Sequence, residues 1–239
     1  MLQRLDKILA SQGTASRSEI QKIIIGGFVS INGNICRKKD FKADPENDII
    51  TVNGKQISFS KHTYIMLNKP KGVLSASEDK NCPTVTDLVP DSIKRKKLFP
   101  AGRLDKDTEG LIIITDDGDY AHRMLSPKNH VDKIYHAVID GRVTEKEIEM
   151  FKNGIVFADG FKCLPAKLRV IENGEKQTCE VTVCEGKFHQ VKKMFLAVGC
   201  TVLELKRVKI GGLPLDDSLA AGQCRVMTAE EYNKVFETE

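Results

Sequence analysis

The spacing of the hydrophobic residues changes near residue 60, and this change constrains the fold more than any other feature. Before it, Leu5, Ile8 and Leu9 lie three and four positions apart, which predicts a short amphipathic helix. After it, apolar residues form short runs or alternate with polar ones, which predicts strands. The expected strands are 64–67, 111–115, 135–139, 179–183 and 202–205, and the expected helices include 144–152 and 187–198.

The order of these elements favours one fold class. Strands and helices do not alternate regularly, so the pattern indicates an α+β fold rather than a doubly wound sheet. Alternation within the strands indicates antiparallel pairing. We therefore expect a small helical module followed by a larger domain, in which helices flank a mixed, mainly antiparallel sheet.

The N-terminal part of the chain predicts two short helices and a small sheet. Ser16, with Glu19 three residues later, forms a capping-box pattern that opens the second helix, and Gly26-Gly27 ends it. Asn32-Gly33 and Asn53-Gly54 both follow short apolar stretches, and such pairs predict tight hairpin turns.

Positive charge is concentrated near the N-terminus and in two short runs. The net charge is +4, and residues 1–60 contain nine Lys and Arg residues against six Asp and Glu residues. The runs are Arg37-Lys38-Lys39 and Lys94-Arg95-Lys96-Lys97. Solvated loops commonly carry such runs, so each has little weight alone, but together they are compatible with a polyanionic partner.

Composition excludes several classes of protein. With 41% hydrophobic and 29% charged residues the chain is typical of soluble globular proteins. No apolar run approaches the ~20 residues that a membrane span needs, and the charged N-terminal segment is unlike a signal peptide. Seven cysteines without a CxxC pair argue against a disulfide framework and a zinc site. We expect a cytoplasmic monomer with reduced cysteines and no metal.

One polar loop carries the most information about chemistry. Residues 101–111 place Arg103, Asp105, Asp107 and Glu109 between glycines, directly before an apolar strand. From the residues alone this is either a structural ion-pair network, which is the more common case, or a reactive site. The acidic residues lack the spacing of an oxygen-ligand metal loop.

Two regions resemble known families. The pattern RLDKxLA…SRSE…G.V.ING, over residues 1–58, is similar to the S4 RNA-binding domain. Four segments over residues 64–230 resemble, in the right order, pseudouridine synthases of the RsuA/RluB/RluE/RluF group: NKPKG at 68–72, GRLDKDTEGL at 102–111, KIYHAV at 133–138 and EGKFHQVKKM at 185–194. The resemblance implies an S4-like domain at 1–58, a linker at 59–63 and a catalytic domain at 64–239.

The second resemblance implies a reaction and roles for four residues. The target uridine is flipped out of the RNA, its glycosidic bond is broken, and the base is rotated and rejoined through carbon without any cofactor. Asp105 is expected to attack the sugar or to act on it as a base. Lys192 would pair with Asp105, Tyr135 would stack on the flipped base, and Arg103 would fill the gap in the RNA and hold its phosphate.

Other polar residues have weaker interpretations. The S4 resemblance implies a face of two helices against structured RNA, where we place Arg4, Lys7, Ser16, Arg17 and Lys22; each is equally well explained as a solvated helix residue. Lys69 and Lys71 flank Pro70 and are interpreted either as phosphate contacts or as solvated loop charges. His189 is interpreted as a packing or hydrogen-bonding residue rather than a general base.

The expected function is the isomerisation of a specific uridine to pseudouridine in ribosomal RNA. The loop sequence, the stretch 125–131 and the compact length look most like the RsuA branch, which modifies small-subunit 16S rRNA. Large-subunit 23S rRNA or tRNA is the alternative within the class. A non-catalytic RNA-binding ribosome-assembly factor would have no need for Asp105, Tyr135 and Lys192 together, and a hydrolase or lyase lacks its usual motifs.

Overall fold

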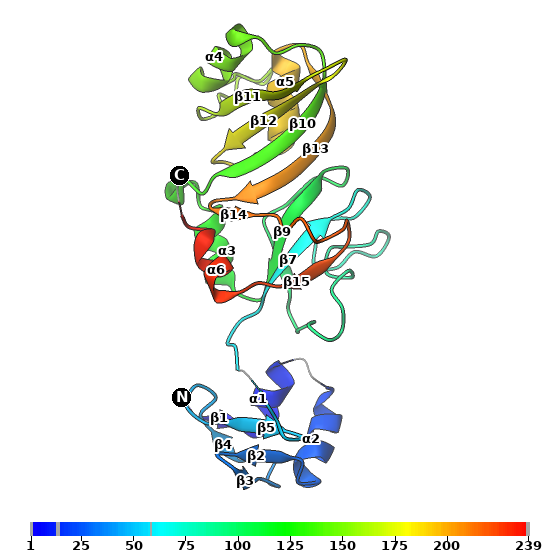
Figure 1. Cartoon of the computed structure of the whole chain (residues 1–239), viewed down its shortest axis with the longest axis vertical. Coiled ribbons are helices and arrows are strands. Elements are labelled where there is room, and N and C mark those ends of the chain that lie inside the picture. Colours follow the sequence, from blue (N-terminus) through cyan, green and yellow to red (C-terminus); the bar gives the residue numbers. More distant parts are fainter. Residues whose placement is uncertain (1, 13–14, 58, 238–239) are drawn as a thin grey trace. The chain divides into compact units, whose positions relative to one another are not determined.

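The chain divides into two compact units. The computed structural model describes residues 2–12, 15–57 and 59–237 (Figure 1). The first unit contains the residues up to Thr63 together with Val89–Leu98, and the second contains Tyr64–Leu88 and the chain from Phe99 onward. Residue 58, where the sequence placed the end of the N-terminal module, lies outside the described residues.

Two helices supply half of the buried core residues of the first unit. Helix α1 spans Leu5–Ser11 and helix α2 spans Arg17–Ile25. Ser16 caps α2: its hydroxyl accepts from the backbone of Glu19, and the Glu19 carboxylate accepts from the backbone of Ser16 at 2.8 Å. The apolar faces of both helices meet in a core that includes Leu5, Ile8, Leu9, Ile20, Ile24, Val29, Ile31 and Ile50.

Short antiparallel strands complete the first unit. The main sheet has the order β3-β2-β5-β6, with β2 Val29–Ile31, β3 Asn34–Ile35, β5 Ile50–Val52 and β6 Lys55–Gln56. A separate pair joins β1 Gln3–Arg4 to β4 Lys42–Ala43. Both residues of each predicted turn have positive φ, at 50° and 82° for Asn32-Gly33 and at 49° and 75° for Asn53-Gly54. Because the tight two-residue hairpin requires this conformation, the two predicted hairpins are confirmed.

One mixed sheet organises the second unit. In the described residues its main path runs β11-β12-β10-β13-β9-β7-β15, while β14 pairs with β13 and β8 pairs with β9. All of its pairings are antiparallel except β13 with β9, which confirms the predicted sheet type. The strands are β7 Tyr64–Lys69, β8 Phe99–Ala101, β9 Glu109–Thr115, β10 Lys133–Asp140, β11 Lys167–Asn173, β12 Gln177–Val183, β13 Thr201–Ile210, β14 Leu213–Pro214 and β15 Cys224–Val226.

Helices cover the two halves of this sheet separately (Figure 1). Helices α4 Glu145–Asn153 and α5 Gln190–Ala197 pack on the half made of β10 to β13, around Phe151 and Phe195. Helices α3 Gly118–Leu125 and α6 Ala229–Lys234 pack on the half made of β7, β9 and β15, where they surround Tyr120. A short 3₁₀ turn, Pro127–Asn129, follows α3.

The two halves meet at the single parallel pairing. Lys206 of β13 lies opposite Glu109 of β9, and Arg207 lies opposite Gly110. Gly110 has φ +102°, and a Cβ atom built on it would lie 2.2 Å from the Arg207 carbonyl oxygen. The close approach of the two strands therefore requires glycine. It also brings the start of β9 to the centre of the sheet.

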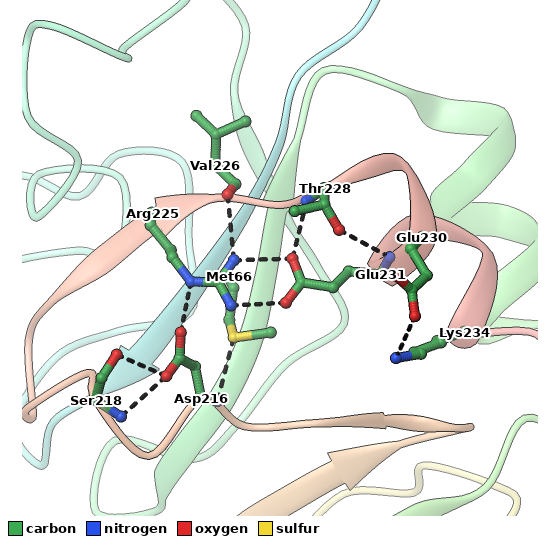
Figure 2. A network of polar contacts seen from close by, with 9 residues as sticks. All are labelled: Met66, Asp216, Ser218, Arg225, Val226, Thr228, Glu230, Glu231 and Lys234. Atoms are coloured by element: carbon green, nitrogen blue, oxygen red, sulfur yellow. Dashed lines mark hydrogen bonds and ion pairs between the residues drawn. The ribbon is translucent and has the colours of Figure 1, made fainter.

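A network of polar contacts fixes the C-terminal elements (Figure 2). Arg225 of β15 donates from Nε to Asp216 at 2.6 Å and from both terminal nitrogens to Glu231, at 2.8 and 2.6 Å. Glu231 also accepts from the backbone of Thr228 at 2.8 Å, as part of the capping box of α6. One guanidinium thus joins an edge strand, a loop and the first turn of a helix.

Replacing this guanidinium is expected to change stability in a pH-dependent way. The Ser218 hydroxyl and Arg225 lower the pKa of Asp216 to about 2, and Arg225 lowers the pKa of Glu231 to about 2. Depressed carboxyl pKa values stabilise the fold above the unfolded values near 4, and this gain is lost as pH falls toward 2. We expect Arg225→Met to lower Tm by about 2–4 °C at pH 7. The difference from wild type should shrink between pH 4.5 and 2, as followed by circular dichroism; a pH-independent difference would contradict this account.

Candidate active site

The polar loop identified in the sequence connects β8 to β9. Its first half is anchored by Leu104, whose side chain is buried. The Ser75 hydroxyl donates to the Leu104 carbonyl at 2.8 Å and accepts from the Leu104 amide at 3.0 Å. Further on, the amide of Gly72 donates to the Lys106 carbonyl at 2.8 Å. The backbone on both sides of Asp105 is therefore fixed by the 70–75 segment.

Asp105 lies between two cationic or potentially cationic groups from the start of α5. Lys192 Nζ is 3.6 Å from Asp105 Oδ2, and His189 Nε2 is 3.5 Å from Asp105 Oδ1. The Asp105 side chain is 27% exposed, so it is shielded but open to a ligand. An anionic carboxylate that keeps access to solvent is suited to attack or to proton transfer.

Lys192 is shared between two carboxylates. Its ammonium donates to Asp107 Oδ1 at 2.6 Å, a closer contact than the one with Asp105. The Lys192 ammonium lowers the pKa of Asp107, whose side chain is 70% exposed. Asp107 is thus the closer partner of Lys192, and Asp105 is the less exposed one. The sequence singled out Lys192 for pairing with Asp105 and did not anticipate this second contact.

Tyr135 is joined to the start of β9 through Arg207, which the sequence analysis did not single out. Tyr135 lies opposite Arg207 in the β10–β13 pairing, and Arg207 lies opposite Gly110. The Arg207 guanidinium is buried; it donates to the Leu111 carbonyl at 2.7 Å and to the Tyr135 hydroxyl at 3.4 Å. A buried arginine inside a strand is thus used to hold the tyrosine against the strand that follows the loop.

Lys69 supports the loop through hydrogen bonds to its backbone. Its side chain is completely buried, and Nζ donates to the carbonyls of Thr108, Pro70 and Lys106 at 2.8, 3.0 and 3.3 Å. Burial lowers the pKa of Lys69 to about 8, although nearby carboxylates including Asp105 oppose this effect. Both interpretations of Lys69 from the sequence, a phosphate contact and a solvated charge, are therefore wrong.

Removing this ammonium is expected to impair the loop. Lys69→Met removes the ammonium donor from three carbonyl oxygens, two of them within three residues of Asp105. The buried Thr108 carbonyl loses its donor, whereas the Lys106 carbonyl still accepts from the Gly72 amide. A displacement of about 1 Å at a reacting group can lower the reaction rate by roughly 10²-fold. We therefore expect the turnover rate of Lys69→Met to fall about 10- to 100-fold. Lys71→Met is the matched control, since Lys71 is 47% exposed and, among the described residues, its ammonium pairs with Glu109 at 3.6 Å. Equal rates for the two variants would rule out the supporting role.

Arg103 lies on the same loop, but its side chain makes no polar contact with the described residues. The side chain is exposed. The structure therefore brings Asp105 and Lys192 together, connects Tyr135 to the same part of the sheet, and leaves Arg103 free to contact a ligand. Among all the residues that the structure describes, no group of three or more His, Cys, Asp or Glu residues is placed to hold a metal ion.

The residues expected on the RNA-binding face lie in the first unit, where a buried carboxylate organises two of them. Asp6 is fully buried and accepts from Arg4 at 3.0 and 2.9 Å, and Arg17 Nη2 lies 3.6 Å away. The hydrogen bonds from Arg4 lower the pKa of Asp6. The hydroxyl of Ser16 is occupied by the helix cap. Lys7 and Lys22 are exposed.

Comparison with known proteins identifies the family. Residues 63–197 match the family described as RNA pseudouridylate synthase. The chain belongs to this family. Residues 3–50 match the S4 domain, which confirms the predicted N-terminal module. In the described residues no helix is long and apolar enough to cross a membrane.

Relatives of this pseudouridine synthase match it along nearly its full length. An uncharacterized RNA pseudouridine synthase of Bacillus subtilis is 41% identical over 99% of both chains. The ribosomal small subunit pseudouridine synthase A of Escherichia coli is 39% identical over 97% of this chain and 99% of its own. A crystal structure of a pseudouridylate synthase covers 97% of this chain and 99% of its own, with a TM-score of 0.67 at 36% identity.

Proposed function

We propose that this pseudouridine synthase isomerises a uridine of small-subunit 16S rRNA, with Asp105 as the catalytic carboxylate. The observation that carries the proposal is the position of Asp105: it lies on an anchored loop at the centre of the sheet, between Lys192 and His189. The choice of RNA is supported by the full-length similarity to the small-subunit enzymes of Escherichia coli and Yersinia pestis. We also propose that the enzyme acts in the cytoplasm as a monomer.

The reaction requires no group from outside the chain and the RNA. The bond from C1′ to N1 of uridine breaks, a bond from C1′ to C5 forms, C5 loses its proton and N1 gains one. Asp105 attacks the sugar or removes a proton from it, and Lys192 offsets its negative charge. Tyr135 stacks on the flipped base, and the exposed guanidinium of Arg103 binds the RNA phosphate and fills the space that the base leaves.

Two alternatives remain distinct from this proposal. A synthase of the same class could act on 23S rRNA or on tRNA, because target choice depends on surface contacts rather than on the catalytic loop. A non-catalytic RNA-binding assembly factor would keep the fold without the reaction. The ion pair between Lys192 and Asp105 favours the enzyme, since a protein that only binds RNA gains nothing from placing a carboxylate in a phosphate-binding region.

Tritium release separates these alternatives. Isomerisation frees the hydrogen at C5, so transcribed 16S and 23S rRNA containing 5-tritiated uridine report the reaction directly. We expect release from 16S rRNA alone. Release from 23S rRNA alone would support the pseudouridine synthase activity but overturn 16S rRNA as the target. No release from either RNA, also after early ribosomal proteins are bound, would favour the assembly factor.

A further inference from the structure

The second basic run of the sequence belongs to the first unit, although the chain around it belongs to the second. Residues Val89–Leu98 group with the N-terminal residues, whereas the segments before and after them group with the sheet of the synthase domain. The run 94–97 is thus part of the unit that contains the S4 domain. Sequence order alone gives no sign of this, because the run lies more than 30 residues beyond the linker.

Hydrogen bonds from Arg95 hold the segment in place. Its Nη1 donates to the Ser60 carbonyl at 2.9 Å, and its Nη2 donates to Gln12 Oε1 at 2.9 Å. Gln12 is the C-terminal cap of α1, and its side-chain amide also donates to the Ser60 carbonyl at 3.4 Å. The guanidinium therefore ties the segment to the end of an S4 helix and to the linker.

The lysines next to Arg95 in this run have exposed side chains. Lys94, Lys96 and Lys97 are exposed, while Val89 and Leu98 at the two ends of the segment are buried. Within the described residues no carboxylate forms an ion pair with these three ammonium groups. A single acidic residue, Asp91, lies in the segment. An anchored segment with three unneutralised cations is a preorganised surface for a polyanion.

We propose that Lys94, Lys96 and Lys97 form a phosphate-binding surface that extends the RNA-binding face of the S4 domain. This inference rests on the proposed function, because the polyanion is the RNA substrate. Ammonium groups on flexible stems contact backbone phosphates without reading bases, so the surface adds affinity and not sequence choice. Arg95 and Gln12 position the surface, because their side chains bond to protein atoms. The three lysines then contact the RNA.

The test measures the binding of transcribed 16S rRNA as a function of KCl concentration. Lys94→Gln, Lys96→Gln and Lys97→Gln are combined in one variant. We expect affinity at 0.1 M KCl to fall about tenfold or more, and the slope of log K against log[KCl] to decrease by about 2, since each lost phosphate contact removes about 0.7–0.9. The control combines Lys146→Gln, Lys162→Gln and Lys176→Gln, which removes the same charge from exposed lysines of the second unit. It should bind within about twofold of wild type.

The outcomes distinguish this inference from the proposed function. If wild type binds 16S rRNA and the triple variant binds equally tightly with the same slope, the surface is ruled out and the proposed function stands. The control variant losing as much affinity as the triple variant would also rule it out, because the effect would then follow net charge alone. A wild-type protein that binds neither free 16S rRNA nor 16S rRNA carrying early ribosomal proteins would overturn both proposals.

A neutral substitution tests the positioning role separately. Gln12→Leu removes the acceptor of Arg95 without changing any charge. The substitution also removes the bonds between the Gln12 side chain and Ser60 and Ser11. We expect it to weaken binding about threefold in the wild-type background, because, of its two anchoring contacts, Arg95 then keeps only the bond to the Ser60 carbonyl. In the background of the triple variant it should have no effect. An equal loss in both backgrounds would contradict a role that acts through the three lysines.

Discussion

Asp105→Asn is expected to reduce the rate of pseudouridine formation by about 10⁴-fold or more, the loss typical when the group that carries the chemistry is removed. The substitution keeps the shape of the side chain. It also keeps the loop anchored, because the anchoring contacts are made by the Leu104 backbone and the Lys69 ammonium. It removes the anionic oxygen that attacks or accepts a proton. RNA affinity should stay close to wild type, since no phosphate contact is lost. The measurement is the single-turnover rate with tritiated 16S rRNA.

Asp107→Asn is the matched control for this prediction. It makes the same chemical change two residues away, on a side chain that also contacts Lys192. Because Asp107 is largely exposed, its loss leaves Lys192 more available to Asp105, and we expect less than about a tenfold change in rate. Comparable losses in the two variants would indicate that the loop depends on its total charge and that Asp105 has no special role.

Gly110→Ala is expected to cause the largest loss of stability among single substitutions near the site. An alanine here has φ +102° and a Cβ atom 2.2 Å from the Arg207 carbonyl, so the strands β9 and β13 must separate. We expect the free energy of unfolding to fall by about 3 kcal/mol or more, measured by urea denaturation. The separation also displaces Arg207 and with it Tyr135, so activity should fall in the folded fraction as well.

Gly118→Ala provides the comparison for this effect. Gly118 opens helix α3, its φ is not positive, and a Cβ atom there meets no other atom within 4 Å. The alanine should change stability by no more than about 1 kcal/mol, and the helix propensity of alanine favours a gain. If both glycine variants unfold at the same urea concentration, the close approach at Gly110 is not required for the sheet.

Local signals in the sequence were sufficient for much of the fold. The capping box at Ser16, the two Asn-Gly turns and the strands around 111–115 and 135–139 depend on short-range preferences, and all are found in the structure. Helix α5 begins at Gln190 instead of residue 187. The cause is a turn in which the Gln190 side chain accepts from the backbone of Lys187 and His189 adopts φ 53°.

The site could be predicted less completely, because its geometry depends on contacts between distant segments. The family resemblance pointed to Asp105 and Lys192, which the structure places 3.6 Å apart. It gave no sign that Lys69 is buried under the loop or that Arg207 holds Tyr135, since lysine and arginine residues in strands are ordinarily exposed. The segment 89–98 belongs to the S4 unit and is held there by hydrogen bonds to residues distant in the sequence, which no local pattern encodes.

The most direct measurement is the pseudouridine content of 16S rRNA after incubation with the purified protein. The RNA is digested to nucleosides, and pseudouridine is separated from uridine by chromatography. Our account predicts that wild type forms pseudouridine in 16S rRNA, that Asp107→Asn also forms it, and that Asp105→Asn forms none. Pseudouridine formed equally well by Asp105→Asn, or none formed by a wild-type protein that binds the RNA, would contradict it.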